Sequence, residues 1–123
     1  MSLERGVELF NAGRYWDAHE AWEEAWMPDR RGRDGGFYKG LIQVAAGCLH
    51  YGRRNRRGTV NKWRSGTAYL RPYLPTHLGL DLAALVAATE ANLAAVEAAA
   101  EWPELTMPRL NKLPGLGPRE AGP

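Results

Sequence analysis

The sequence predicts an all-α fold, a compact bundle of about five main helices followed by a Pro-rich C-terminal tail. Through most of the chain, apolar side chains recur at intervals of three and four residues, which is the spacing of one helix face. No stretch of useful length alternates apolar and polar residues as a half-buried strand does. The 123 residues, 45% of them hydrophobic, suffice for one buried core. The helical domain is expected over residues 1–101 and the tail over 102–123.

The first two expected helices are short and follow each other closely. The first spans about residues 2–12, beginning at Ser2 and ending at the Asn-Ala-Gly turn of residues 11–13. The second spans about residues 15–27 and ends at Pro28. It is amphipathic, with an apolar stripe formed by Tyr15, Ala18, Trp22, Ala25 and Trp26.

The third and fourth helices are expected on either side of a basic turn. The third, about residues 37–53, follows a polar loop with several glycines and is apolar around most of its circumference, so it should be central. Asn55 can cap the fourth helix, whose end Pro72 and Pro75 disrupt. One seam of the fourth helix carries Val60, Trp63, Thr67, Leu70 and Leu74.

The fifth expected helix starts at Asp81, runs to about residue 101 and contains ten alanines. Its core-facing stripe consists of Leu82, Leu85, Val86, Leu93 and Val96. A second face, rich in alanine and free of charge, is either a tolerant surface, a surface covered by the tail, or the seam of a homodimer. A homodimer would place Ala91 and Ala95 in its interface, and two-fold symmetry would make this interface self-complementary.

The last 22 residues contain five prolines and three glycines, which excludes another long helix. The tail is therefore expected to be extended. It should pack in part on the bundle and be loose after Pro114. The residues expected to make this contact are Trp102, Leu105, Met107 and Leu110.

The net charge of +2 hides an uneven distribution along the chain. Residues 1–29 carry two basic and seven acidic side chains, residues 30–71 eleven basic and one acidic, and residues 72–123 three basic and six acidic. The middle segment either faces an anionic partner or folds against the acidic first third and is neutralised there. Its densest run is a candidate anion-binding surface or, alternatively, a cap for the preceding helix dipole. This run contains Arg53, Arg54, Arg56 and Arg57.

Polar residues of the second helix provide half of a candidate binding site. His19 and Glu23 lie one turn apart at the edge of the core-facing side. Glu20 points further towards solvent but could serve a site at a helix crossing, and Trp26 could form a wall. A buried His19 that simply hydrogen-bonds to Glu23 or to backbone is the structural alternative.

The third helix provides the other half. Gly40, Gln43, Gly47 and His50 follow one another at spacings of three, four and three residues, which places them on one narrow stripe. Each interior glycine costs about 1 kcal/mol relative to alanine. Close approach of another helix or of a ligand can offset that cost. If the second and third helices are antiparallel, His19, Glu23, Gln43 and His50 could share one crevice.

The predicted function is a binding module that holds a small polar ligand or peptide through this His/Glu/Gln cluster. One alternative is a metal-assisted or acid-base enzyme that uses the same cluster, with His19, His50 and Glu23 or Glu20 as candidate metal ligands. Another is a nucleic-acid-associated protein that uses the basic segment 53–71. Enzymatic activity stays open, and no cofactor is identified.

The single Cys48 cannot form an internal disulfide, and there is no cysteine cluster of the kind that binds metals, so a reducing compartment, the cytoplasm, is expected. No uninterrupted apolar run reaches the roughly 18 residues that a membrane span needs. Residues 1–5 also lack the apolar run of a secretory signal. No membrane association is expected.

Three segments give the chain a resemblance to a known family. They are FNAGRYWDAHE at residues 10–20, followed by Glu23 and Trp26; KGLIQVAA at residues 39–46, followed by His50; and GRRNRRG at residues 52–58. Over about residues 3–100 the chain resembles the small prokaryotic helical family known as domain of unknown function 309. The resemblance implies a compact multi-helical domain with the His-Glu and Gly-Leu-Ile-Gln segments as its hallmark positions. It implies no particular activity.

Overall fold

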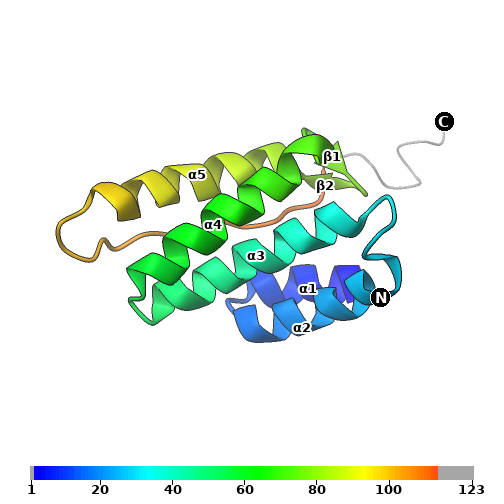
Figure 1. The fold of residues 1–123 in the computed structure, drawn as a ribbon, viewed down its shortest axis with the longest axis horizontal. Coiled ribbons are helices and arrows are strands. Elements are labelled where there is room, and N and C mark those ends of the chain that lie inside the picture. The colour runs from blue at the N-terminus through cyan, green and yellow to red at the C-terminus, as the bar shows by residue number, and fades with distance from the viewer. Residues whose placement is uncertain (1, 114–123) are drawn as a thin grey trace.

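The structure is a computed structural model that describes residues 2–113, and five α-helices make up most of it (Figure 1). The predicted all-α bundle is confirmed. The helices are α1 (Ser2–Asn11), α2 (Tyr15–Trp26), α3 (Gly35–Gly52), α4 (Arg56–Leu70) and α5 (Leu82–Ala98). Two short 3-10 helices, η1 (Met27–Asp29) and η2 (Arg71–Tyr73), follow α2 and α4. None of the described helices is long and apolar enough to span a membrane.

The predicted helix starts at Asn55 and Asp81 are confirmed by their capping bonds. The Asn55 side chain accepts a hydrogen bond from the Gly58 N–H at 3.0 Å, and the Asp81 carboxylate accepts one from the Ala84 N–H at 3.0 Å. Each bond satisfies one of the N–H groups that have no partner inside a helix's first turn. Gly13, with φ of 81°, makes the turn between α1 and α2.

The structure contains a short hairpin that the sequence pattern does not predict. Strand β1 (Thr76–His77) pairs antiparallel with β2 (Leu80–Asp81), with Thr76 opposite Asp81 and His77 opposite Leu80. The turn residues Leu78 and Gly79 both have positive φ, 50° and 78°, as tight hairpin turns require. Strands of two residues are too short to show an alternating pattern in the sequence.

Helix α3 occupies the centre of the bundle, between α2 on one side and α4 on the other (Figure 1). Trp22 of α2 and Trp63 of α4 are both fully buried, and each indole N–H has a backbone partner. Trp22 Nε1 donates to the Leu3 carbonyl at 3.1 Å, and Trp63 Nε1 donates to the Val44 carbonyl at 3.2 Å. These bonds satisfy the only polar atom of each buried indole, so both rings can act as core residues.

The segment after α5 runs back along the bundle in extended form (Figure 1). Leu110 is fully buried, and Trp102, Leu105 and Met107 pack against the core in part. The Asn11 side chain holds both backbone groups of Leu110: its Nδ2 donates to the Leu110 carbonyl at 2.7 Å, and its Oδ1 accepts from the Leu110 N–H at 2.9 Å. The expected loose segment after Pro114 lies outside the described residues.

The alanine-rich face of α5 is exposed although the extended segment packs on the same helix. The core-facing stripe is as expected, with Leu82, Leu85, Val86 and Val96 buried and Leu93 partly buried. On the other side, Ala91 is exposed and Ala95 is half-buried. A homodimer built on this face stays a prediction.

Candidate functional site

The interior glycines of α3 serve helix packing. A Cβ on Gly40 would lie 2.6 Å from Leu70 Cγ, and one on Gly47 would lie 2.2 Å from Trp63 Cδ1. Opposite Gly40, a Cβ on Gly66 would lie 3.0 Å from the Gly40 carbonyl oxygen. Of the two explanations for the glycines, close approach of another helix is the one the structure supports. That helix is α4.

Gln43 and His50 lie on a different, half-exposed face of α3. Together with Gly36, Lys39 and Ala46 they recur at spacings of three and four residues, and all five are half-buried. The predicted single stripe of glycines and polar residues is therefore two stripes. The glycine stripe packs on α4, and the polar one borders solvent.

A matching row of residues lies on α4. Gly58, Lys62, Ser65 and Tyr69 recur at spacings of four, three and four residues, and each is half-buried or exposed. The two rows meet at both ends: Gly58 lies against the His50 ring, and Tyr69 lines a pocket with Lys39. We call the polar members of these rows the polar stripe: Lys39, Gln43, His50, Lys62, Ser65 and Tyr69. Lys62, Ser65 and Tyr69 lie in the basic segment 53–71 that the sequence offered as a nucleic-acid candidate. Lys39 was not predicted as a site residue, although the same three-and-four spacing could have found it.

His50 is held in its neutral form at one end of the polar stripe. Because the Oδ1 of Asn55 accepts from the Gly58 N–H, its Nδ2 is left to face His50 Nδ1, at 3.1 Å. An amide N–H donor at this position favours an imidazole whose proton is on Nε2. Partial burial lowers the pKa of His50 below the ordinary 6.5, and the charges of Lys62 and Arg53 lower it as well.

This environment predicts that the chain loses stability on acidification partly through His50. Because its pKa is lower in the folded than in the unfolded chain, the stabilisation is complete above pH 6.5 and is lost as the pH falls towards the folded value. Urea unfolding between about pH 7.5 and pH 5 should show a larger loss for the wild-type chain than for His50→Gln. Equal pH dependence of the two chains would contradict this assignment.

His19 makes its ring contact within α2. Its imidazole stacks on the ring of Trp16, with centroids 5.3 Å apart and an interplanar angle of 8°, and its Nδ1 is buried without a hydrogen-bond partner among residues 2–113. His50 contacts Asn55 and Gly58 instead. Neither set of contacts joins the two imidazoles, so the convergence of His19, Glu23, Gln43 and His50 stays a prediction.

The carboxylates of α2 face a separate, open hollow. This hollow is lined by Glu20, Glu23, Glu24 and Met27. Within residues 2–113, no three His, Cys, Asp or Glu side chains gather as a metal site requires. The metal site predicted at His19, Glu23 and His50 stays a prediction, and in the described part of the chain the two histidine rings contact different partners.

Cys48 is a core residue. Burial raises the pKa of its thiol to about 12, and a side-chain hydrogen bond to Trp63 lowers it only in part. At neutral pH the thiol therefore stays protonated. A thiolate nucleophile is not available at this position.

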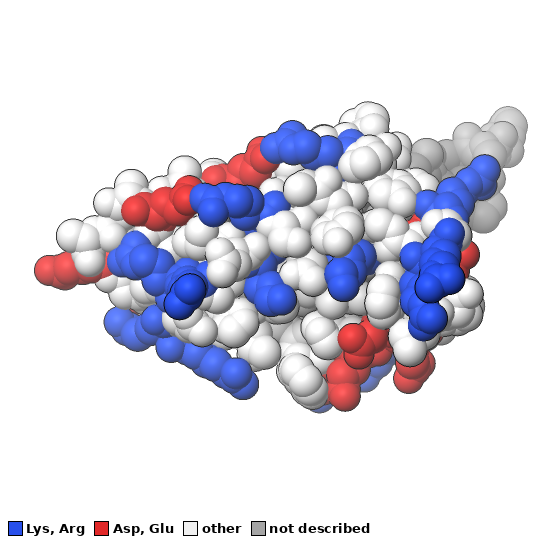
Figure 2. Space-filling view, in the orientation of Figure 1, with Lys and Arg blue, Asp and Glu red and all other residues white. Residues whose placement is uncertain are grey.

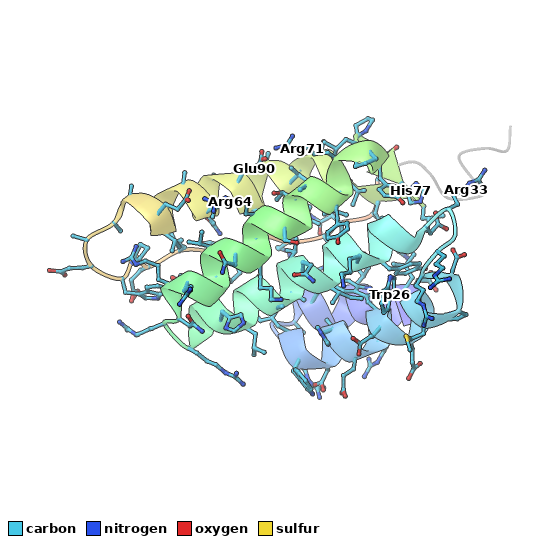
Figure 3. All side chains as sticks on the ribbon, in the orientation of Figure 1. Trp26, Arg33, Arg64, Arg71, His77 and Glu90 are labelled. Atoms are coloured by element: carbon cyan, nitrogen blue, oxygen red, sulfur yellow. The ribbon has the colours of Figure 1, made fainter. Side chains whose placement is uncertain are left out.

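The basic middle of the chain is partly neutralised by α5. Arg64 forms an ion pair with Glu97. Arg71 forms one with Glu90 (Figure 3). One of the two alternatives was neutralisation by the acidic first third, but these two arginines pair with the last third of the chain instead. Figure 2 shows acidic side chains over α5 and α2, and basic side chains over α3, α4 and the turn between them.

Arg56 differs from the other arginines of its run. Its guanidinium donates to the Val96 carbonyl and lies over the Trp102 ring, 5.8 Å from the ring centroid. Arg56 therefore joins α4 to α5 and to the extended segment. The prediction that it belongs to an anion-binding surface gives way to this structural role. Its neighbours Arg53, Arg54 and Arg57 are exposed.

A basic pocket of about 220 Å³ lies where α3 begins, beside Trp26 (Figure 3). Lys39 Nζ lies over the Trp26 ring, 5.1 Å from the ring centroid. Asp34, the residue before α3, does not cap the helix with its side chain, because its carboxylate contacts His77 Nε2 at 2.7 Å. No side chain caps α3, and its first two residues, Gly35 and Gly36, line the pocket, so the positive end of the helix lies beside it, although the Gly35 N–H itself donates to the Gly32 carbonyl at 3.2 Å. We call this the α3 pocket; its lining residues are Trp26, Arg30, Gly35, Gly36, Lys39 and Tyr69.

Together these features define a helical-bundle protein with a basic, half-exposed surface over its two central helices. The model of the family described as Domain of unknown function (DUF309) matches residues 3–61 of the chain. The predicted resemblance is confirmed over α1, α2, α3 and the start of α4, a shorter span than the expected residues 3–100. No curated protein matches the chain.

Proposed function

We propose that this chain is a binding module for a small anionic ligand, held in the α3 pocket. The observation that carries the proposal is the meeting of Lys39 and Arg30 with the uncapped start of α3 in one hollow. A helix N-terminus is equivalent to about half a positive charge. Two cations beside it form a strongly favourable environment for a phosphate or a carboxylate.

The pocket's size and walls restrict the ligand further. Ligand pockets for drug-sized molecules occupy roughly 300–1,000 Å³. The α3 pocket, at about 220 Å³, suits a smaller molecule. Trp26 and Tyr69, a residue that is 42% exposed, provide flat apolar walls beside the cations. The preferred ligand is a small anion that also carries a planar group.

The acidic hollow of α2 does not suit the same ligand. Glu20 and Glu23, which belong to the cluster predicted from the sequence, line that hollow and would repel an anion. The proposal therefore keeps the predicted binding of a small polar ligand but places it at Trp26 and Lys39. A cytoplasmic location, expected from the lone Cys48, belongs to this proposal.

The proposal predicts that inorganic pyrophosphate binds at the start of α3. In an NMR titration of the full chain, the amide signals of Gly36 and Lys39 should shift most. Lys39→Gln should weaken binding about tenfold or more, because a hydrogen bond to a charged group contributes about 1.5–3 kcal/mol. Lys112→Gln removes the same charge from an exposed lysine paired with Glu4 and is the control.

Two results would contradict the proposal. One is a titration in which shifts are spread evenly over the basic surface rather than concentrated at α3. The other is an equal loss of affinity in Lys39→Gln and in Lys112→Gln, since a general charge effect would then explain the binding.

A further inference from the structure

We infer that the polar stripe binds a single-stranded nucleic acid, with the α3 pocket holding a phosphate at one end. The inference rests on the proposed function because Lys39 belongs to both the α3 pocket and the polar stripe. It extends the ligand class from a small anion to a chain of phosphates.

The first support is the charge of the surface. Between Gly35 and Arg71 the sequence contains no Asp or Glu. Arg64 of α4 and Arg71 of η2 form ion pairs with α5, and Arg56 contacts Val96 and Trp102. Within residues 2–113 the remaining cations of this segment form no ion pair and can meet phosphates: Arg53, Arg54, Arg57, Lys62, and Lys39, which also lies over the Trp26 ring.

The second support is the length and shape of the stripe. Lys39 and His50 are eleven residues apart on α3, which corresponds to roughly 17 Å along a helix. Over this length the α3 row is half-buried throughout, and the α4 row beside it ends in the exposed Tyr69. A narrow row of half-buried residues along two adjacent helices can be followed by one flexible strand more readily than by a rigid duplex.

The third support is the kind of side chain that accompanies the cations. Tyr69 at one end and the His50 ring at the other offer flat surfaces on which bases can stack. Gln43 and Ser65, between them, provide hydrogen-bond donors and acceptors. An acidic peptide would use the cations but has no need of exposed rings, so these residues favour a nucleic acid.

The test is fluorescence anisotropy of the full chain with a ten-nucleotide oligo-U strand. The variant R53Q/R57Q/K62Q should bind at least tenfold more weakly at 50 mM salt. Because each phosphate contact on a single strand contributes about 0.7 to the slope of log affinity against log salt, this variant should also reduce the slope by about 2. The control R5Q/R14Q/K112Q removes the same charge from exposed ion pairs elsewhere and should change neither quantity.

Pyrophosphate binding measured on the same variants separates the two proposals. If pyrophosphate binds at α3 and R53Q/R57Q/K62Q leaves that binding unchanged while weakening the oligonucleotide, both proposals are supported. If pyrophosphate binds but the oligonucleotide does not at 50 mM salt, the stripe is overturned and the pocket stands. If only the oligonucleotide binds, with the expected sensitivity, the pocket is wrong and the stripe stands.

A competition experiment distinguishes a nucleic acid from an acidic peptide as the partner of the polar stripe. Oligo-glutamate of the same number of charges should displace the strand at least tenfold less effectively than unlabelled oligo-U. Equal displacement would show that only charge is recognised and would overturn the inference. Equal affinity for a duplex of the same length would do so as well.

Discussion

Trp63→Ala is expected to lower the free energy of unfolding by about 3–5 kcal/mol, the range for removing a large aromatic ring from a core. The ring is fully buried, stacks beside Tyr51 with centroids 6.1 Å apart, and lies against Gly47. Its Nε1 also donates to the Val44 carbonyl. The substitution therefore removes both the packing and the hydrogen bond that join α4 to the centre of α3.

Urea unfolding followed by circular dichroism measures this effect, with Trp16→Ala as the matched control. Trp16 is 54% exposed, so its truncation should cost less than about 1 kcal/mol. A loss for Trp63→Ala below about 2 kcal/mol would show that α4 does not depend on this ring.

Gly47→Ala is expected to destabilise the chain by about 1–2 kcal/mol, the net of two opposing effects. Overpacking typically costs about 1–3 kcal/mol, and a Cβ at this position would lie 2.2 Å from Trp63 Cδ1, a ring atom that cannot bend away. The better helix propensity of alanine returns about 1 kcal/mol. Gly52→Ala is the control in the same helix, since its Cβ would meet nothing within 4 Å, and it should be neutral or slightly stabilising.

The double variant Gly47→Ala/Trp63→Ala tests the cause of this loss. Without the indole, the new methyl group has room, so adding Gly47→Ala to Trp63→Ala should cost little or should stabilise. Residues in direct contact are expected to be non-additive in this way. Additive losses in urea unfolding would show that Gly47 is needed for a reason other than the ring.

Local sequence signals predicted the helices well because each signal acts over a few residues. Asn55 and Asp81 cap the helices that follow them through bonds to residues three positions ahead. The same locality explains the end of α2 before Pro28. The hairpin around Gly79 was missed because its strands are too short to carry a periodic pattern.

The candidate site was harder to predict because helical spacing does not tell which neighbour a face meets. Gly40 and Gly47 share a face that packs on α4, whereas Gln43 and His50 lie one step around the helix, at the solvent border. Lys39 was overlooked because its importance depends on Trp26 of another helix. Arg56 was misassigned because its partners, Val96 and Trp102, are about 40 residues or more away.

The sequence by itself determined the all-α class, the number of main helices, the capping residues, the uneven charge and the family resemblance. All of these depend on composition or on contacts within one or two turns. Only the tertiary structure decided which arginines are paired, which glycines admit α4, and where cations meet an uncapped helix start. Those outcomes depend on contacts between side chains of separate helices. The energy of each contact depends on the distance and orientation that the packing of the helices imposes.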